Sequence, residues 1–305
     1  MGRARTGHSP RDESRGTATN VAVTVRLERE TQPMETIEFL PVVKAYPQLS
    51  RTYGEVSCIA GIQTAPGDLR WIRLYPVPFR ALDDAQQFAK YQSIRLHAEA
   101  HSGDRRPETR RPDRDSIELV GEALSTSRGW ESRRRFVEPL MADSMCAIQR
   151  MQRDAGTSLG VFRPKEVIDL LIEQRDVRQD KQELARAWAA QPSLFDGLES
   201  GEQALQIEAL EQIPWTFKYK YRCADTACNG HEQTIVDWEV AELYRRVGRR
   251  DGWQDLMRKK WLNELCGPER DTAFFVGNQH QHPGSFLVLG VWWPPHRPDQ
   301  LSLAI

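Results

Sequence analysis

The stretch PWTFKYKYRCADTACNGHEQTIVDWE, residues 214–239, carries the patterns of a strand, a tight turn and a helix in direct succession. Aromatic residues at positions 215, 217, 219 and 221 alternate with basic residues at 218, 220 and 222, which is the two-residue period of a half-buried strand. Asn229 and Gly230 suit a tight turn because both residue types tolerate positive φ. Thr234 can cap a helix, which we expect over residues 234–247. This part of the chain is therefore expected to mix strands and helices.

The first half of the chain is rich in strand-like patterns. Residues 21–122 contain short alternating or apolar segments separated by Gly and Pro, among them GEVSCIAGI (54–62) and LRWIRLY (69–75). One short helix is expected at residues 83–91 and a longer one over residues 130–153. These patterns predict a β-rich N-terminal half that forms a curled sheet or a small barrel.

Downstream of the opening stretch we expect a second helix and a hairpin. The helix covers residues 252–265, and TAFFVGN (272–278) followed by SFLVLGVWW (285–293) predicts the hairpin. Runs of strands and helices that do not alternate regularly predict an α+β fold and argue against a doubly wound parallel sheet. The C-terminal α+β unit of this fold contains a Cys/His knuckle.

Composition divides the chain into four expected regions. Residues 1–20 are expected to form a disordered basic arm, and residues 21–175 a β-rich domain with a helical insert. Residues 176–211 hold a helix and an acidic hinge, since positions 180 to 211 carry seven acids and two bases. Residues 212–305 hold the knuckle, two helices and the C-terminal hairpin.

The overall composition indicates a polar globular protein of a reducing compartment. The formal net charge of −1 names no partner by itself, and five cysteines, an odd number, do not resemble a disulfide framework. The sequence contains no apolar run near the roughly twenty residues that cross a bilayer. Its N-terminus lacks the apolar segment of a secretory signal. We therefore expect a cytoplasmic protein with no membrane partner.

The knuckle has the residue types of a zinc site. Cys223, Cys228 and His231 follow the spacing C-x4-C-x2-H, and a tight turn can present such thiolate and imidazole ligands to a tetrahedral zinc ion. This predicts one structural zinc, with the fourth ligand expected among Cys266, His280 and His282. The alternative is an ordinary turn between a strand and a helix that contains two free thiols.

Several classes of nucleotide and hydrolase site have no support in the sequence. There is no G-x-G-x-x-G, no Walker A sequence, no G-x-S-x-G elbow and no zinc deaminase signature. We therefore expect no nucleotide cofactor.

Three basic and aromatic segments predict a surface that binds nucleic acid. They are RWIRLYPVPFR (70–80), GDRRPETRRPDR (103–114) and YRRVGRRDGWQDLMRKKW (244–261). Basic side chains neutralise phosphates, and aromatic rings offer faces to unstacked bases. The alternative is that the aromatic residues lie in the core and that the arginine-rich loop is an internal salt-bridge network. The residues expected to contact nucleic acid are Arg70, Trp71, Arg73, Tyr75, Arg80, Arg105, Arg106, Lys218, Lys220, Arg258 and Lys259.

Taken together, RWIRLYPVPFR, DRRPE (104–108) and CNGHEQTIVDWE (228–239) resemble a bacterial group found among phage-defence genes. We place in this group the antiphage DNA glycosylases, which remove glucosylated hydroxymethylcytosine from phage DNA. The resemblance implies a DNA-acting enzyme that excises a modified base and leaves an abasic site. A metal-dependent nuclease and a non-enzymatic sensor of nucleic acid or nucleotides remain the alternatives.

Base excision needs a carboxylate that stabilises the oxocarbenium-like sugar or activates water. Asp237 is the first candidate and Glu55 the second; the alternative for each is a capping or salt-bridged acid. Asp237 and Glu239 would point about two hundred degrees apart on a helix, so they are not expected to form one paired site.

The expected hinge contains QPSLFDGL, residues 191–198, which looks like the short peptide by which bacterial replication and repair proteins dock on the sliding clamp. Gln191 would bind at the rim of an apolar pocket that receives Leu194 and Phe195. The alternative is that these two apolar side chains pack on the protein's own core.

Overall fold

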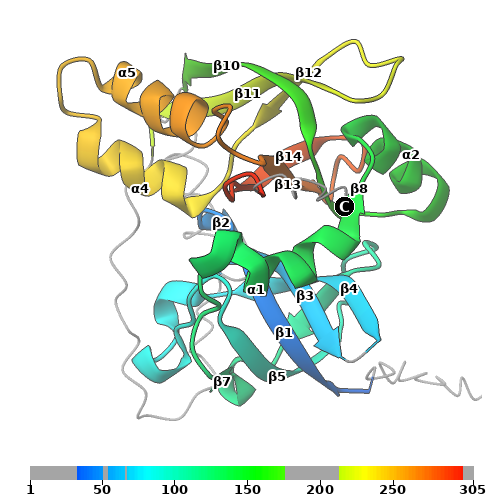
Figure 1. Cartoon of the computed structure of the whole chain (residues 1–305). Coiled ribbons are helices and arrows are strands. Elements are labelled where there is room, and N and C mark those ends of the chain that lie inside the picture. Colours follow the sequence, from blue (N-terminus) through cyan, green and yellow to red (C-terminus); the bar gives the residue numbers. More distant parts are fainter. Residues whose placement is uncertain (1–32, 51–53, 66, 176–212, 298–305) are drawn as a thin grey trace, which may run out of the picture. The chain divides into compact units, whose positions relative to one another are not determined.

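The computed structural model describes residues 33–50, 54–65, 67–175 and 213–297, which belong to one compact unit that begins at Pro33 (Figure 1). The expected basic arm at residues 1–20 and acidic hinge at 176–211 lie outside the described residues. The expected clamp peptide with Gln191, Leu194 and Phe195 lies outside them as well, so clamp docking stays a prediction.

Five strands of the N-terminal half close into a small barrel. They are hydrogen-bonded in the order β1 (Glu35–Lys44), β3 (Gly54–Ala65), β4 (Asp68–Val77), β6 (Thr109–Pro112) and β5 (Ser93–Ala100), and β5 pairs again with β1. Only β4 and β6 are parallel among these pairs. Two short strands, β2 (Gln48–Ser50) and β7 (Glu118–Val120), extend the sheet along β3 and β5. The predicted α+β class with a β-rich, barrel-forming half is confirmed.

Alternation along the strands places one face in the barrel interior and the other against the C-terminal part. Ile72 and Leu74 of β4 lie in the barrel core with Ile37 and Phe39 of β1. Trp71, one position out of phase, packs in a second cluster between the barrel and the C-terminal sheet. The two-residue period thus builds two cores from one strand.

The C-terminal part contains two further sheets. One has the order β14 (Phe286–Trp292), β13 (Ala273–Asn278), β9 (Leu159–Phe162) and β8 (Met141–Ala142). The other has the order β10 (Pro164–Gln174), β11 (Trp215–Cys223) and β12 (His231–Thr234). The antiparallel pair β13 and β14 confirms the predicted hairpin. Strands β9 and β10, which the sequence groups with the first half, pair with the C-terminal strands β13 and β11, and β8 pairs with β9.

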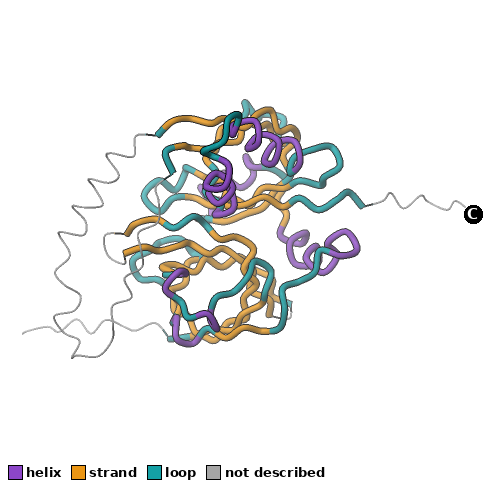
Figure 2. The backbone as a smooth tube through the Cα atoms, turned by 90° about the vertical axis from the view of Figure 1, so that its left-hand side faces the viewer, coloured by secondary structure: helices purple, strands orange, loops and turns teal. Residues whose placement is uncertain are grey.

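Helices are few and short among the described residues (Figure 2). The helix expected over 130–153 is two helices, α1 (Ser127–Val137) and α2 (Met145–Ala155), and the prediction of one helix is wrong. Pro139 lies between them in the 3-10 turn η4 (Glu138–Leu140), and β8 follows that turn. Ser144 then caps α2 by accepting a hydrogen bond from the Ala147 amide at 3.0 Å.

Other helical segments also differ from the sequence-based expectations in their bounds. The first C-terminal helix, α4 (Trp238–Val247), begins at residue 238 because Thr234 still belongs to β12. The second consists of α5 (Trp253–Arg258) and a π-helical turn, η5 (Lys259–Glu264). The helix expected at 83–91 is reduced to one 3-10 turn. The 3-10 turns of the first half are η1 (Phe79–Ala81), η2 (Asp84–Gln86) and η3 (Arg114–Ser116).

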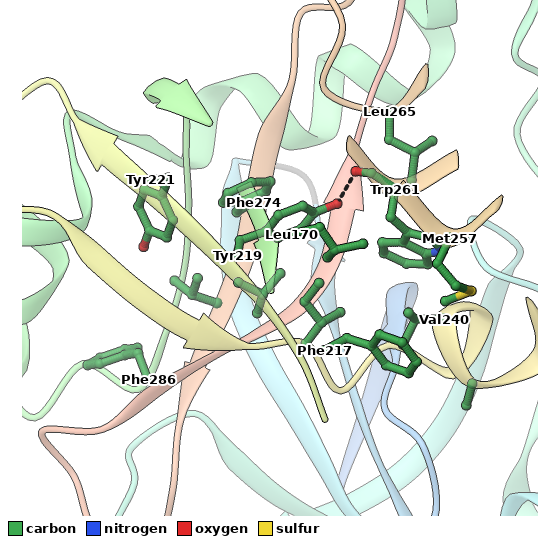
Figure 3. Packing of buried hydrophobic residues seen from close by; sticks show 14 of the residues in the cluster. Leu170, Phe217, Tyr219, Tyr221, Val240, Met257, Trp261, Leu265, Phe274 and Phe286 are labelled. Carbon is green, nitrogen blue, oxygen red and sulfur yellow. Dashed lines mark hydrogen bonds between the residues drawn. The ribbon is translucent and has the colours of Figure 1, made fainter. Parts of the chain in front are cut away.

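The alternating strand β11 supplies the centre of the C-terminal core (Figure 3). Phe217, Tyr219 and Tyr221 are all buried, and Tyr219 stacks on Phe274 with ring centroids 4.6 Å apart. The Tyr219 hydroxyl donates a hydrogen bond to the Trp261 carbonyl at 2.5 Å, which ties the sheet to η5. Each buried aromatic side chain contributes on the order of 2 kcal/mol. No helix in the described part of the chain is long and apolar enough to cross a membrane.

Candidate functional site

Four side chains that favour zinc meet at the end of the β11–β12 hairpin. Cys223 ends β11, Cys228 lies in the connecting turn, His231 begins β12, and Cys146 lies in the first turn of α2. Their four ligand atoms all lie within 4.8 Å of one another. The sequence therefore brings three candidate ligands together in one turn, and the packing of α2 adds the fourth.

The separations of these atoms suit a tetrahedral ion. The sulfur of Cys223 lies 3.6 Å from the sulfur of Cys146 and 3.6 Å from Nε2 of His231, while Cys146 Sγ lies 3.5 Å from the same nitrogen. Zinc–sulfur and zinc–nitrogen bonds of ~2.3 and ~2.0 Å at tetrahedral angles give ligand separations of ~3.8 and ~3.5 Å. The residues present therefore fit one zinc ion with three thiolates and one imidazole.

Local hydrogen bonds shape the turn that carries Cys228. The Asp225 carboxylate accepts from the Ala227 amide at 2.9 Å, and the Cys228 amide donates to the Asp225 carbonyl at 3.1 Å. Gly230 has a φ of +98°, a conformation that favours glycine. Arg150 of α2 pairs with the same carboxylate at 2.8 Å. This ion pair fastens α2 to the turn beside the four ligands.

The fourth ligand differs from the sequence-based candidates. Cys266 donates a hydrogen bond to the Trp261 carbonyl, His280 pairs with Asp104, and His282 is exposed, and none of them belongs to the cluster. Their selection is wrong because closeness in sequence to the knuckle does not determine closeness in space. Cys146 is an isolated cysteine 77 residues before Cys223, so no spacing motif could have indicated it.

A second cluster of functional groups lies where the barrel meets α4. Lys90 Nζ contacts the Asp237 carboxylate at 3.0 Å and the Glu239 carboxylate at 3.0 Å. The side chains are 2% exposed for Asp237, 18% for Lys90 and 63% for Glu239. The charges thus form a chain that runs from the interior to the surface.

Two backbone features place these groups. Asp237 is the N-cap of α4, and its side chain accepts from the Glu239 amide at 2.9 Å. Tyr91, which follows Lys90, has a φ of +63°, an unusual conformation for a bulky residue. The Tyr91 amide donates to the Pro41 carbonyl at 2.7 Å, which holds Lys90 in place. Strain of this kind is concentrated at functional sites.

The arrangement corrects the expectation that Asp237 and Glu239 cannot act together. Because Asp237 lies before the first helical residue, the angle between positions on an ideal helix does not apply. Both acids contact Lys90. Burial raises the pKa of Asp237 to about 6, with Lys90 acting against this shift and Glu239 adding to it. A carboxyl group with such a pKa changes charge close to neutral pH.

Lys44 lies beside this cluster, at the end of β1. An isolated bridge pairs Ala45 with Asp237, which sets β1 next to the start of α4. Lys44 Nζ lies 3.8 Å from the centroid of the Phe79 ring. Burial, and then Lys90, lowers the pKa of Lys44 to about 8. The sequence analysis identifies neither Lys44 nor Lys90, and no motif surrounds either residue.

The second candidate carboxylate, Glu55, is paired with a cation. Arg80 Nη1 contacts the Glu55 carboxylate at 2.8 Å, and both side chains are partly buried. Asp237 is likewise both a cap and an ion-pair partner. Both acids therefore have the contacts of a salt-bridged or capping acid, which is the alternative to a catalytic role. Of the two, only Asp237 belongs to the cluster with Lys90 and Glu239.

Arg73 is the clearest departure among the residues expected to bind nucleic acid. Its side chain is buried, and Nη2 donates to the Ser158 carbonyl at 2.9 Å and to the Ser158 hydroxyl at 3.1 Å. Trp71 on the same face packs edge-on against Phe275. The C-terminal sheet packs on this face of β4, so the buried Arg73 cannot meet a phosphate there, whereas Trp71 is partly buried.

Most of the other expected contacts are already paired within the protein. Tyr75 lies against His101 with ring centroids 6.2 Å apart. Arg105 and Lys259 are exposed. Surface ion pairs contribute at most about 1 kcal/mol, so DNA phosphates can displace the exposed ones. The cations that pair with a carboxylate are Arg70 with Asp68, Arg80 with Glu55, Arg106 with Asp104, Lys218 with Glu173, Lys220 with Glu232 and Arg258 with Asp169.

Two family models match the chain. A model described as a domain of unknown function, DUF8757, matches residues 141–304, and another with the same description, DUF8758, matches residues 35–139. The first contains the four zinc-favouring residues and Asp237, and the second contains Lys44 and Lys90. No curated protein matches the chain.

Proposed function

The chain belongs to the DUF8757 family, and for this chain we propose a DNA glycosylase that excises a modified cytosine, with glucosylated hydroxymethylcytosine as the expected base. The observation that carries the proposal is the buried Asp237 carboxylate held by Lys90, which leads through Glu239 to the surface. The resemblance to the antiphage glycosylases supports the choice of reaction. The proposal also implies a cytoplasmic protein that acts on phage DNA.

The proposed reaction breaks the bond between C1′ of the sugar and N1 of the base. Water supplies the oxygen that attaches to C1′, and one of its protons passes to Asp237. The base leaves with the bonding electron pair and takes up a proton from solvent. Asp237 then releases its proton and is ionised again. Ionised Asp237 lies in a site of low water content, where a negative charge stabilises the positive sugar strongly. Lys90 positions the carboxylate and keeps it ionised in the neutral range.

We assign the zinc, which the four ligands Cys146, Cys223, Cys228 and His231 would hold, a structural role. Four protein ligands leave no open position for water or substrate. A zinc ion there would fasten α2 to the β11–β12 hairpin. The proposal therefore derives no step of the reaction from the metal.

The test compares the wild type with Asp237→Asn on plain duplex DNA and on duplex DNA that contains glucosylated hydroxymethylcytosine. Asparagine keeps the shape of the side chain and its capping oxygen, so α4 is expected to remain capped. The variant Asp251→Asn, at an exposed turn position, is the matched control. Released base is measured by mass spectrometry, and abasic sites by strand breaks after mild alkali.

We expect base release from glucosylated DNA by the wild type and by Asp251→Asn, and a rate at least ~100-fold lower for Asp237→Asn. No base release by a folded wild type from the modified duplex refutes the proposal. Direct breaks that require a divalent metal would indicate a nuclease, and binding without breaks a sensor. Full activity of Asp237→Asn would remove Asp237 from the mechanism.

Docking on a bacterial sliding clamp remains part of the proposal, and it is supported by the peptide QPSLFDGL at residues 191–198 alone. Titration with purified clamp, comparing the wild type with the Leu194→Ala/Phe195→Ala variant, tests it. Equal binding by the two proteins would remove the peptide from the proposal.

A further inference from the structure

Lys44 is an amine in unusual surroundings. Its Nζ lies 3.8 Å from the centroid of Phe79 and 5.1 Å from that of Phe88, and it donates a hydrogen bond to the Phe88 carbonyl. The rings of Phe79 and Phe88 contact each other edge to face, with centroids 5.1 Å apart. The amine therefore rests on a wall of two aromatic rings, and Lys44 is partly buried there.

This wall belongs to the same site as Asp237. Phe79 contacts Trp238 with ring centroids 5.8 Å apart, and Trp238 directly follows Asp237. The bridge between Ala45 and Asp237 brings the end of β1 to the start of α4. Lys90 follows Phe88 by two residues, and its positive charge contributes to the lowered pKa of Lys44. Lys44 and the Asp237–Lys90 pair thus share one boundary between the barrel and α4.

Such surroundings activate a lysine as a nucleophile. Removal from water and a neighbouring cation both favour the neutral amine, which is the reactive form. With a pKa of about 8, about one tenth of Lys44 is neutral at pH 7, against less than ~0.1% for an ordinary lysine. The charge of Glu239 acts in the opposite direction, and the pKa of Lys44 is lowered all the same.

We propose that Lys44 is a nucleophilic amine that captures the aldehyde of an abasic deoxyribose as an imine and so gives the protein a strand-cleaving activity. The substrate is the product of the proposed base excision, and to that extent the inference rests on the proposed function. Nothing in the step involves a metal, a redox partner or another cofactor.

The reaction balances in atoms and charge. The lone pair of Nζ attacks C1′, a nitrogen–carbon bond forms, and the carbonyl oxygen leaves as water. The imine withdraws electrons, so a proton at C2′ can pass to a carboxylate, for which Glu239 is exposed and near. The bond between C3′ and its oxygen then breaks, and the phosphate leaves with the electron pair. Water hydrolyses the remaining imine and restores Lys44.

The experiment uses a duplex with one abasic site made beforehand, so that base excision by this protein is not needed. The full chain is incubated with this duplex in EDTA and sodium borohydride, which reduces an imine to a stable amine. Intact mass and peptide mapping then locate the adduct. Lys44→Arg keeps a cation on the aromatic wall without a neutral amine, and Lys165→Arg, at an exposed lysine outside the expected DNA-binding residues, is the matched control.

We expect an adduct on the peptide that contains Lys44 in the wild type and in Lys165→Arg. In Lys44→Arg the adduct yield should fall on the order of 100-fold. Strand cleavage in EDTA without alkali should fall with it. Unchanged trapping in a folded Lys44→Arg, an adduct that maps to Lys90, or no adduct in a wild type that binds the duplex overturns the inference. Base release from modified DNA without trapping refutes this inference alone, whereas trapping without base release refutes only the proposed glycosylase.

Discussion

Replacing Cys146 by alanine should remove most of the zinc affinity, even though this residue is far from the knuckle in sequence. Its sulfur lies 3.6 Å from Cys223 Sγ and 3.5 Å from His231 Nε2, the separations of a shared tetrahedral ion. The matched control is Cys266→Ala. Cys266 is a partly buried cysteine outside the cluster whose thiol donates to the Trp261 carbonyl.

The size of the effect follows from dividing the binding free energy among the ligands. Structural zinc sites bind with apparent free energies of ~10–16 kcal/mol, so one ligand of four accounts for ~2.5–4 kcal/mol. That loss corresponds to a ~10²–10³-fold weaker Kd. Because zinc binds the folded state, chelation should also lower the melting temperature of the wild type, and lower that of Cys146→Ala much less.

The assay is competition with a chromogenic chelator, combined with metal analysis of protein purified without a histidine tag. We expect about one zinc per chain in the wild type and in Cys266→Ala, and easy loss of zinc from Cys146→Ala. Two results would refute the reasoning. One is a folded wild type with less than about a tenth of a zinc per chain. The other is a Cys146→Ala variant that holds the metal as tightly as the wild type.

Three further predictions concern pH, stability and DNA binding. The rate of base release should fall as the pH is lowered from 7 through about 6. Burial raises the pKa of Asp237 to about 6, and only the ionised carboxylate stabilises the sugar. A rate that stays constant from pH 7 to 5 would contradict this prediction. The buried Arg134 pairs with two carboxylates at 2.6 and 2.8 Å, so Arg134→Met should lower the free energy of unfolding in urea by about 3 kcal/mol. The control Arg135→Met, at an exposed neighbour, should lower it by under ~0.5 kcal/mol. Equal losses in the two variants would contradict a stabilising role for the Arg134 ion pairs. Charge reversal at the exposed Arg105 and Lys259 should weaken DNA binding and lower its salt dependence by about one unit for each lost phosphate contact, and wild-type binding that ignores salt would count against a nucleic-acid surface.

The contrast between Cys223 and Cys146 illustrates how much of the site can be predicted. Three ligands lie within nine residues, and one turn brings them together whatever the rest of the chain does. The fourth depends on the packing of α2 against the hairpin, which in turn depends on the whole C-terminal core. The spacing of residues in the sequence therefore indicates the ligands that share one turn, but it does not indicate a ligand that helix packing places beside them.

Arg73 and Lys90 show the same limit for charged residues. In the sequence, Arg73 lies in an alternating strand among aromatic residues, which is equally typical of an exposed and of a covered face. Only the C-terminal sheet that packs on β4 decides that it is buried. Lys90 lies 147 residues before its partner Asp237 and has no recognisable motif, so their ion pair follows from the docking of the barrel on α4.

The sequence by itself determined the α+β class, the strand-rich first half, the aromatic face of β11, the C-terminal hairpin and three of the four zinc-favouring side chains. Each of these depends on a period of two residues or on a turn, and neighbours in sequence determine both. Tertiary structure alone decided the closure of the barrel, the division of one expected helix into α1 and α2, Cys146 as the fourth zinc-favouring side chain, and the approach of Lys44 and Lys90 to Asp237. These features depend on contacts between distant segments, whose free energy comes from burying surfaces that no local pattern pairs with each other.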